Sequence, residues 1–226
     1  MRKDKLISNN IYHTYNRGVE KRPLFINNQD YSRFIDDIII FNDIKLVVNP
    51  KRRIRDIKNG DHKRKPLVDI LAFCLMPNHY HLLLRQRVES GITEFMRKLG
   101  AGYANYFNLK HQRVGPLFQG KFKSVLIDDE SQFMYIPFYI HLNPLDLHRS
   151  GWQNKGIGDS KKAIEFLDHY KWSSHSDYVD KAKFSLVLQK DFLKEYFGGA
   201  PEYAKVFSDF INDFDFSAVD NNLILE

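Results

Sequence analysis

The stretch MPNHYHLLLR, Met76–Arg85, follows the apolar segment LVDILAFCLM and places two histidines inside an apolar run. Pro77 and Asn78 form turns readily, so the apolar residues on either side are predicted to be the two strands of a hairpin. Side chains alternate along a strand, and His79 and His81 should therefore point to the same face. Two imidazoles that share a face can bind one divalent metal ion.

The segments around this hairpin predict the rest of the fold. The strand before the turn is apolar at successive positions, which favours a central strand covered on both sides. Residues 10–25 indicate a strand that leads into a loop, and the helix after it has Asp30 as its expected cap. Helical spacing predicts two more helices at residues 91–110 and 131–142, with a strand in PLFQGKFKSVLI between them.

The order strand, helix, strand, turn, strand, helix, strand, helix favours an α+β fold, in which helices back a mainly antiparallel β-sheet. After about Gly151 the pattern changes to short amphipathic stretches, which predict a C-terminal helical extension. We therefore expect one domain over residues 1–150 and the extension over residues 151–226.

Composition limits the class of protein. The chain has 226 residues, of which 43% are hydrophobic, enough for a full globular core. Its one cysteine, Cys74, allows no disulfide within the chain and is interpreted as a small buried apolar residue rather than a reactive thiol. No stretch reaches the roughly 18 apolar residues of a membrane span, and the first residues do not resemble a signal peptide. We expect a cytoplasmic protein with no membrane partner.

Positive charge is concentrated in Lys51–Lys65, which holds eight basic and two acidic residues. The net charge of this segment therefore equals that of the whole chain, +6. So polar a run, broken by Asn59 and Gly60, is predicted to be a mobile loop or a β-ribbon. It would suit contact with phosphates. The alternative is a solvated insertion with no partner.

A second motif, YIHLNP, could complete a site with the histidines. Tyr139 and Asn143 are four residues apart, on one face of the predicted helix. A metal held by two histidines and an amide oxygen would keep open positions for polarising a phosphate, and a neighbouring tyrosine could act as the nucleophile. Without such completion, two partnered structural histidines would be the commoner explanation. His141 is interpreted as a surface residue of the helix.

These motifs carry a family resemblance. MPNHYHLLL, GYANYFNLKHQRVGPLFQGKFKS and YIHLNP resemble the single-tyrosine transposases of the HUH nuclease superfamily, named for two histidines that flank a bulky hydrophobic residue. YHTYNRGVEKRPLF and YKWSSHSDY resemble the branch of REP-associated tyrosine transposases. The resemblance covers most of residues 10–180 and implies a ferredoxin-like or RRM-like nuclease core.

The resemblance implies a metal-dependent enzyme that cuts and rejoins single-stranded DNA, often with a hairpin beside the cleavage point. His79, His81 and Asn143 would be ligands of Mg²⁺ or Mn²⁺. Tyr139 would attack the scissile phosphate and leave a 5′-phosphotyrosine and a free 3′-hydroxyl. Because the covalent intermediate stores the energy of the phosphodiester bond, no nucleotide cofactor is expected.

The sequence leaves open alternatives for the nucleophile, the activity and the oligomeric state. Pro137 would kink or restart the helix, which makes Tyr135 the second candidate nucleophile, although only Tyr139 keeps the four-residue spacing to Asn143. The chain could also be a nucleic-acid-binding relative without catalysis, or a metal-dependent phosphoesterase that uses water. A homodimer is possible.

Five polar residues are weaker candidates for DNA binding. They lie at the end of the first predicted strand and near the strand that follows residue 117, and they could contact phosphates or be solvated side chains. These are Asn16, Arg17, Gln119, Lys121 and Lys123.

Overall fold

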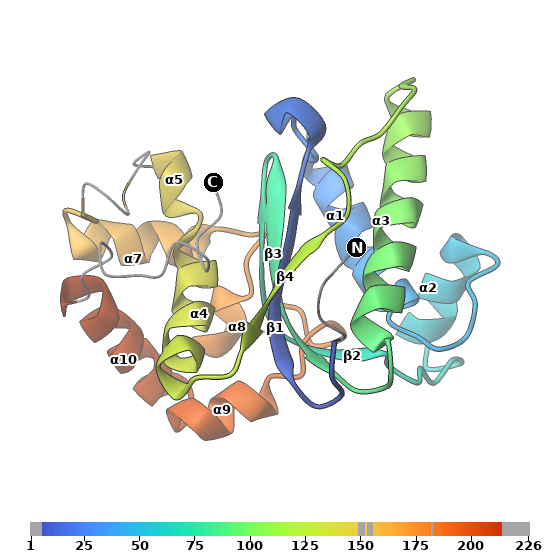
Figure 1. Cartoon of the computed structure of the whole chain (residues 1–226). Helices are drawn as coiled ribbons and strands as arrows, with labels where there is room; N and C mark the ends of the chain where they lie inside the picture. Colours follow the sequence, from blue (N-terminus) through green and yellow to red (C-terminus); the bar gives the residue numbers. More distant parts are fainter. Residues whose placement is uncertain (1–5, 149–151, 153–155, 182, 214–226) are drawn as a thin grey trace.

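The structure is a computed structural model that describes residues 6–148, 152, 156–181 and 183–213. A four-stranded antiparallel sheet in the order β2-β3-β1-β4 lies between two groups of helices (Figure 1). This arrangement confirms the predicted α+β fold with a mainly antiparallel sheet. The strands are β1 (Ile11–Arg17), β2 (Val68–Met76), β3 (His79–Gln86) and β4 (Lys123–Ile127).

Two layers of helices enclose the sheet. One face is covered by α1 and α3, with α2 beyond them, and the other by α4 and the C-terminal helices (Figure 1). The expected domain boundary near residue 150 lies outside the described residues. No helix in the described part of the chain is long and apolar enough to cross a membrane. The helices are η1 (Val19–Lys21), α1 (Asn28–Phe41), α2 (Pro50–Lys58), α3 (Gly91–Lys110), α4 (Glu130–Leu142), α5 (Leu145–His148), α7 (Ser160–His169), α8 (His175–Tyr178), α9 (Asp191–Phe197) and α10 (Ala200–Asp213).

Strand β2 forms an edge of the sheet, so the prediction of a central strand was wrong. The C-terminal extension covers this edge: the N–H of Leu75 donates to the carbonyl oxygen of Trp172 at 2.9 Å, and the N–H of Ser174 donates to that of Phe73 at 3.0 Å. All nine residues of β2 are buried, including Cys74 as predicted. An edge strand covered in this way has the same continuous apolar sequence as a central strand.

The turn at Pro77 and Asn78 joins β2 to β3 as predicted, and the register of β3 with β1 fixes which residues share a face. His81 lies opposite Tyr15 and His79 lies opposite Arg17. Because side chains alternate, these residues point towards α4, whereas their neighbours in the sequence point towards α3. Each face of the sheet therefore has its own hydrophobic core.

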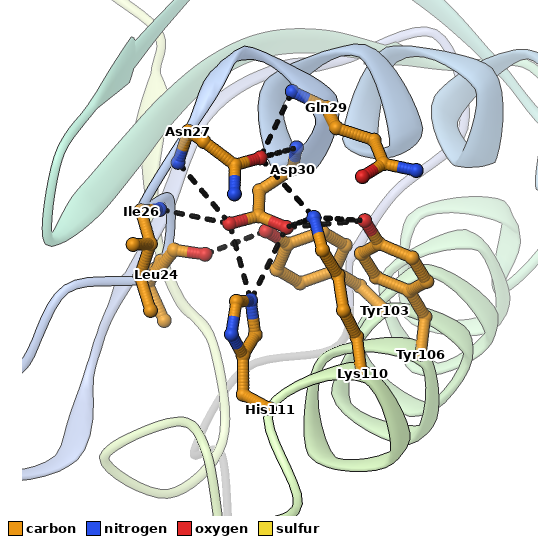
Figure 2. Close-up of polar contacts among 9 residues, drawn as sticks. All are labelled: Leu24, Ile26, Asn27, Gln29, Asp30, Tyr103, Tyr106, Lys110 and His111. Atoms are coloured by element: carbon orange, nitrogen blue, oxygen red, sulfur yellow. Dashed lines mark hydrogen bonds and ion pairs between the residues drawn. The ribbon is translucent and has the colours of Figure 1, made fainter.

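Helix α1 begins after Asn27, which is its N-cap, so Asp30 is not the cap that the sequence predicted. Asp30 lies three residues further on, and the two side chains form a reciprocal capping box. Figure 2 shows that the buried carboxylate of Asp30 also meets residues at the C-terminal end of α3: Lys110 Nζ at 2.7 Å, and the Tyr106 hydroxyl at 3.1 Å. This cluster ties the start of α1 to the end of α3.

The first half of the basic segment is a docked helix at residues 50–58, not part of a mobile loop or a β-ribbon as the sequence predicted, and residues 59–65 follow it without a helix or strand. Asn49 caps the helix, and the buried Ile57 anchors it. Arg53 Nη1 lies 3.0 Å from a carboxylate oxygen of the buried Asp43. The prediction missed the helix because we gave more weight to the charge of the segment than to its asparagine cap and amphipathic spacing.

Candidate active site

His79 is the first residue of β3, directly after the turn, and its ring is oriented by that turn. Its Nδ1 atom lies 2.7 Å from Oδ1 of Asn78. An amide oxygen can only accept a hydrogen bond, so Nδ1 carries the proton. The lone pair of the neutral ring is then on Nε2, which is the atom available to a ligand.

His81 is oriented by a residue from the neighbouring strand. Its Nδ1 atom lies 2.9 Å from Nε2 of His13 on β1, and the two rings stack. Nε2 of His81 is buried and has no hydrogen-bond partner among the described residues. Since buried polar atoms are nearly always satisfied, this nitrogen indicates a place for a ligand. His13 was not among the residues predicted from the sequence, although its position two residues before Tyr15 places it on the same face.

Asn143 lies at the C-terminal end of α4, where its orientation is fixed. Its Nδ2 donates to the backbone carbonyl oxygen of Tyr139 at 2.8 Å, which leaves the amide oxygen for other contacts. The same side chain also acts against the decrease in the pKa values of His79 and His81, which places it beside both imidazoles. The helix thus brings an amide oxygen to the two histidines.

Both histidines are held in the neutral state. Burial lowers the pKa of His79 to about 4, with the side chain of Asn143 acting in the opposite direction and the positive charge of Arg17 adding to the decrease. Burial also holds the pKa of His81 well below its ordinary value, and the neighbouring His79 and His13 lower it further. The neutral imidazole is the form that binds metals, so both rings are ready to ligate at neutral pH.

Tyr139 packs directly against His81 and His13. The edge of its ring meets His81 at a centroid distance of 5.8 Å and His13 at 6.0 Å, while Tyr135 stacks on it at 5.6 Å. Helix α4 runs from its cap at Asp129 through Pro137 without restarting, so the spacing from Tyr139 to Asn143 is helical. The exposed fraction of Tyr139 is 1% and that of His81 is 0%.

Three of the five candidate DNA-binding residues lie on the face of the sheet that carries the histidines. The Nε atom of Arg17 donates to Oε1 of Gln119, and the positive charge of Arg17 acts on His79. Lys123 Nζ lies 5.9 Å from the centre of the Tyr15 ring. These side chains place positive charge beside the histidines.

The other two candidates, Asn16 and Lys121, lie away from the histidines. Asn16 alternates with Tyr15 and Arg17 along β1 and so points to the opposite face, where its Nδ2 donates to the carbonyl oxygen of Gly120 at 3.2 Å. Both residues line a cavity on that face. The structure therefore does not bring all five candidates to one site.

His141 is fully buried, so its interpretation as a surface residue was wrong. Nε2 lies 2.7 Å from Oγ of Ser174, and Nδ1 lies 2.6 Å from the hydroxyl of Tyr203. The reason is that the C-terminal extension packs on the side of α4 that faces away from the sheet. Every residue from Tyr135 to Leu142 is consequently buried.

The donor set near Tyr139 fits a divalent ion, although it is not a cluster of several acidic residues. Within the described ranges, no group of three or more His, Cys, Asp or Glu residues could hold a metal ion. Two neutral imidazoles and an amide oxygen remain as donors, one of them the unpartnered Nε2 of His81. Nitrogen and amide oxygen ligands of this kind suit borderline and hard divalent cations.

One family model matches the central part of the chain. Residues 44–143 match the model of a family described as "Transposase IS200 like", which confirms the resemblance to single-tyrosine transposases. The match begins after β1 and ends at Asn143. None of the curated proteins compared with the chain matches it.

One similar solved structure is described as "Structure of the REP associates tyrosine transposase bound to a REP hairpin". It is 15% identical in sequence to this chain, with a TM-score of 0.45. The alignment covers 84% of this chain and 91% of that one.

Proposed function

We propose that this chain, whose residues 44–143 match the model of an IS200-like transposase family, cuts and rejoins single-stranded DNA through Tyr139. The observation that supports this most directly is the packing of the Tyr139 ring against His81, whose Nε2 has no partner in the described part of the chain. The Tyr139 ring, two neutral imidazoles and the amide of Asn143 then lie together. That combination suits phosphoryl transfer to a phenol oxygen.

In this proposal His79, His81 and Asn143 hold Mg²⁺ or Mn²⁺. A bound ion would polarise the scissile phosphate and stabilise the charge that develops on its oxygens. Tyr139 loses its hydroxyl proton and its oxygen bonds to phosphorus, while the bond from phosphorus to the 3′ oxygen breaks. The products are a 5′-phosphotyrosine and a strand that ends in a 3′-hydroxyl.

Rejoining is the reverse of the same step. A 3′-hydroxyl from the same or another strand attacks the phosphotyrosine and releases Tyr139, so the number of phosphodiester bonds is conserved. No nucleotide cofactor is therefore required. We expect the substrate to be a single strand with a hairpin beside the cut, as the sequence resemblance implies.

Access to Tyr139 requires a local rearrangement. At an exposed fraction of 1% its hydroxyl cannot meet a phosphate from solvent in this structure. His79 is partly exposed at the mouth of the site, and Arg17 beside it is also partly exposed. A phosphate would first meet these two residues and reach Tyr139 when α4 moves away from the sheet.

The proposal is tested by covalent trapping. Hairpins with randomised unpaired flanks, labelled at the 3′ end, are incubated with the protein and Mg²⁺ or Mn²⁺ and separated by denaturing electrophoresis. The wild type should retain label on the protein, because the fragment downstream of the cut carries the phosphotyrosine. Tyr139→Phe should abolish the adduct, and His79→Ala should reduce it.

Tyr135→Phe is the matched control, since it removes a hydroxyl from the same helix, one turn away. It should leave the adduct intact. Cleavage by Tyr139→Phe at the wild-type rate would instead support a phosphoesterase that uses water. A shifted DNA band without any adduct in the wild type would support a binding protein that lacks catalysis.

A further inference from the structure

A cavity lies on the face of the sheet opposite to the candidate active site. It has a volume of about 550 Å³ and lies between α3 and the loop at residues 117–122. We name it the back pocket. The residues that matter for its chemistry are Asn16, Tyr80, Met96, Arg97, Phe118 and Lys121.

The back pocket and the candidate active site are separated by the thickness of one sheet. Asn16 pairs with Tyr80 across β1 and β3, and both side chains point into the back pocket. The next pair along the same strands is Arg17 with His79, which points to the other face. The two sites therefore lie back to back at the same end of the sheet.

The segment that leads into β4 has contacts on both faces. Gln119 accepts a hydrogen bond from Arg17 on the histidine face, whereas Lys121 lines the back pocket. Two residues later, Lys123 lies near the Tyr15 ring on the histidine face again. A DNA strand at the histidines could cross this basic segment and reach the back pocket within a few nucleotides, because consecutive phosphates lie only a few ångströms apart.

The chemistry of the back pocket matches a nucleobase joined to phosphate. Tyr80, Phe118 and Met96 give it aromatic and apolar walls, and bases stack on such side chains. Arg97 and Lys121 are exposed, and neither forms an ion pair with any described residue. Apolar walls with two free cations at the rim are the arrangement expected for a ligand that is flat at one end and anionic at the other.

We infer that the back pocket binds one unpaired nucleobase of the strand that is cut at Tyr139, with a neighbouring phosphate on Arg97 and Lys121. This inference rests on the proposed function, since it takes single-stranded DNA as the partner. Holding one base behind the sheet would fix the distance along the strand between that base and the cleavage point. The back pocket would thus contribute to the choice of the scissile bond.

Gly100 offers a test that does not weaken the fold. It lines the back pocket from α3, and a Cβ atom at this position would meet nothing closer than the Phe118 ring, at 4.0 Å. Gly100→Leu should therefore fill the cavity while replacing a poor helix former by a good one. Ala101→Leu is the matched control, because Ala101 is the next residue of the same helix and is exposed.

Binding is measured by fluorescence anisotropy with one hairpin selected from the pool with randomised flanks. The same hairpin is also prepared as a series of variants, each of which lacks the base at one position of the flank. One such abasic position should weaken binding to the wild type by about tenfold, the typical contribution of one stacked base. Gly100→Leu should bind the intact strand about tenfold more weakly and be insensitive to that position. Ala101→Leu should behave like the wild type.

Three results would overturn the inference: wild-type affinity in Gly100→Leu, the same abasic profile in Gly100→Leu as in the wild type, or the absence of any sensitive position. Thermal unfolding verifies that Gly100→Leu is folded. If it is not, the double variant Arg97→Gln, Lys121→Gln replaces it, and the slope of log affinity against log salt should decrease by about 0.7 to 1.4. An unchanged slope would also contradict the inference.

The same samples are assayed for the covalent adduct at saturating DNA, which separates the two proposals. An adduct without any sensitive abasic position would support cleavage by Tyr139 and reject the base site. A sensitive position without an adduct would support the base site and reject catalysis.

Discussion

The Nε2 atom of His13 lies 2.9 Å from the Nδ1 atom of His81, so a residue of β1 orients a proposed metal ligand of β3. Both side chains are fully buried. The family match starts at residue 44 and does not include β1, although this strand lies between β3 and β4 and also supplies Arg17. The candidate site therefore depends on a strand outside the matched segment.

Removing the His13 ring should impair cleavage without removing a proposed ligand. We expect His13→Ala to lower the rate of adduct formation by about 10- to 100-fold at limiting metal, as is typical when the partner of a ligating histidine is lost. His13→Gln places an amide nitrogen near the position of Nε2 and should recover part of the rate. His169→Ala, which changes an exposed histidine on α7, is the control. Equal rates for His13→Ala and the wild type would reject this role of His13.

Sequence alone could predict the features that depend on local spacing. The alternation of His79 and His81 and the four-residue spacing of Tyr139 and Asn143 need no knowledge of other segments, and the structure places these residues together. His13 was missed because its contact with His81 spans 68 residues and depends on which strands pair.

The errors at β2 and His141 have a common physical cause. The C-terminal extension covers both the free edge of β2 and the outer side of α4, and buried sequences look alike whether a sheet or a helix covers them. Short amphipathic stretches show that an extension is helical, but not which surface it packs on. The position of the extension is therefore information that only the tertiary structure contains.

The network around His141 should link the extension to the stability of α4. His141→Ala leaves Ser174 and Tyr203 without a shared buried partner and creates a cavity, and we expect it to lower the free energy of unfolding by about 3 kcal/mol. Tyr203→Phe removes one hydroxyl and should cost about 1 kcal/mol. Urea unfolding of both single variants and of the double variant measures the coupling free energy between His141 and Tyr203. If the two effects simply add, the hydrogen bond contributes nothing to stability.

The Asp30 cluster should make stability depend on pH. Burial alone would raise the pKa of Asp30, but hydrogen bonds from Lys110, the Ile26 N–H, Tyr106 and His111 outweigh it and lower the pKa below its ordinary value. A depressed pKa stabilises the fold above the pKa of the unfolded chain, near 3.8, and this stabilisation is lost as pH falls through the folded value.

We therefore expect Asp30→Asn to lower the free energy of unfolding by about 2 kcal/mol at pH 7, because the partly exposed Lys110 and the Tyr106 hydroxyl lose their charged acceptor. The difference from the wild type should shrink below pH 4, where the wild-type carboxylate becomes protonated. Asp36→Asn on the same helix, whose ion pair with Lys58 is partly exposed, should cost less than about 1 kcal/mol. A difference between Asp30→Asn and the wild type that is constant from pH 3 to pH 7 would contradict the assignment.

The basic side chains of helix α2 are of two kinds, one that stabilises the fold and one that is exposed to solvent. Arg53 is bound to the buried Asp43 and so belongs to the fold, whereas Lys51, Arg52 and Arg55 are exposed on a helix whose position is fixed by Ile57. A fixed array of exposed cations would release counterions from DNA without a cost for ordering the segment.

Replacing Lys51, Arg52 and Arg55 by glutamine should therefore leave the unfolding midpoint nearly unchanged. If each contacts one phosphate of a single strand, the slope of log affinity against log salt should decrease by about 2. Arg53→Gln should do the opposite, lowering stability by about 3 kcal/mol because it leaves a buried carboxylate with one partner fewer. Anisotropy titrations over a range of salt concentrations, paired with urea unfolding, measure both effects. A triple variant with the wild-type salt slope would mean that α2 is a solvated insertion that does not contact DNA.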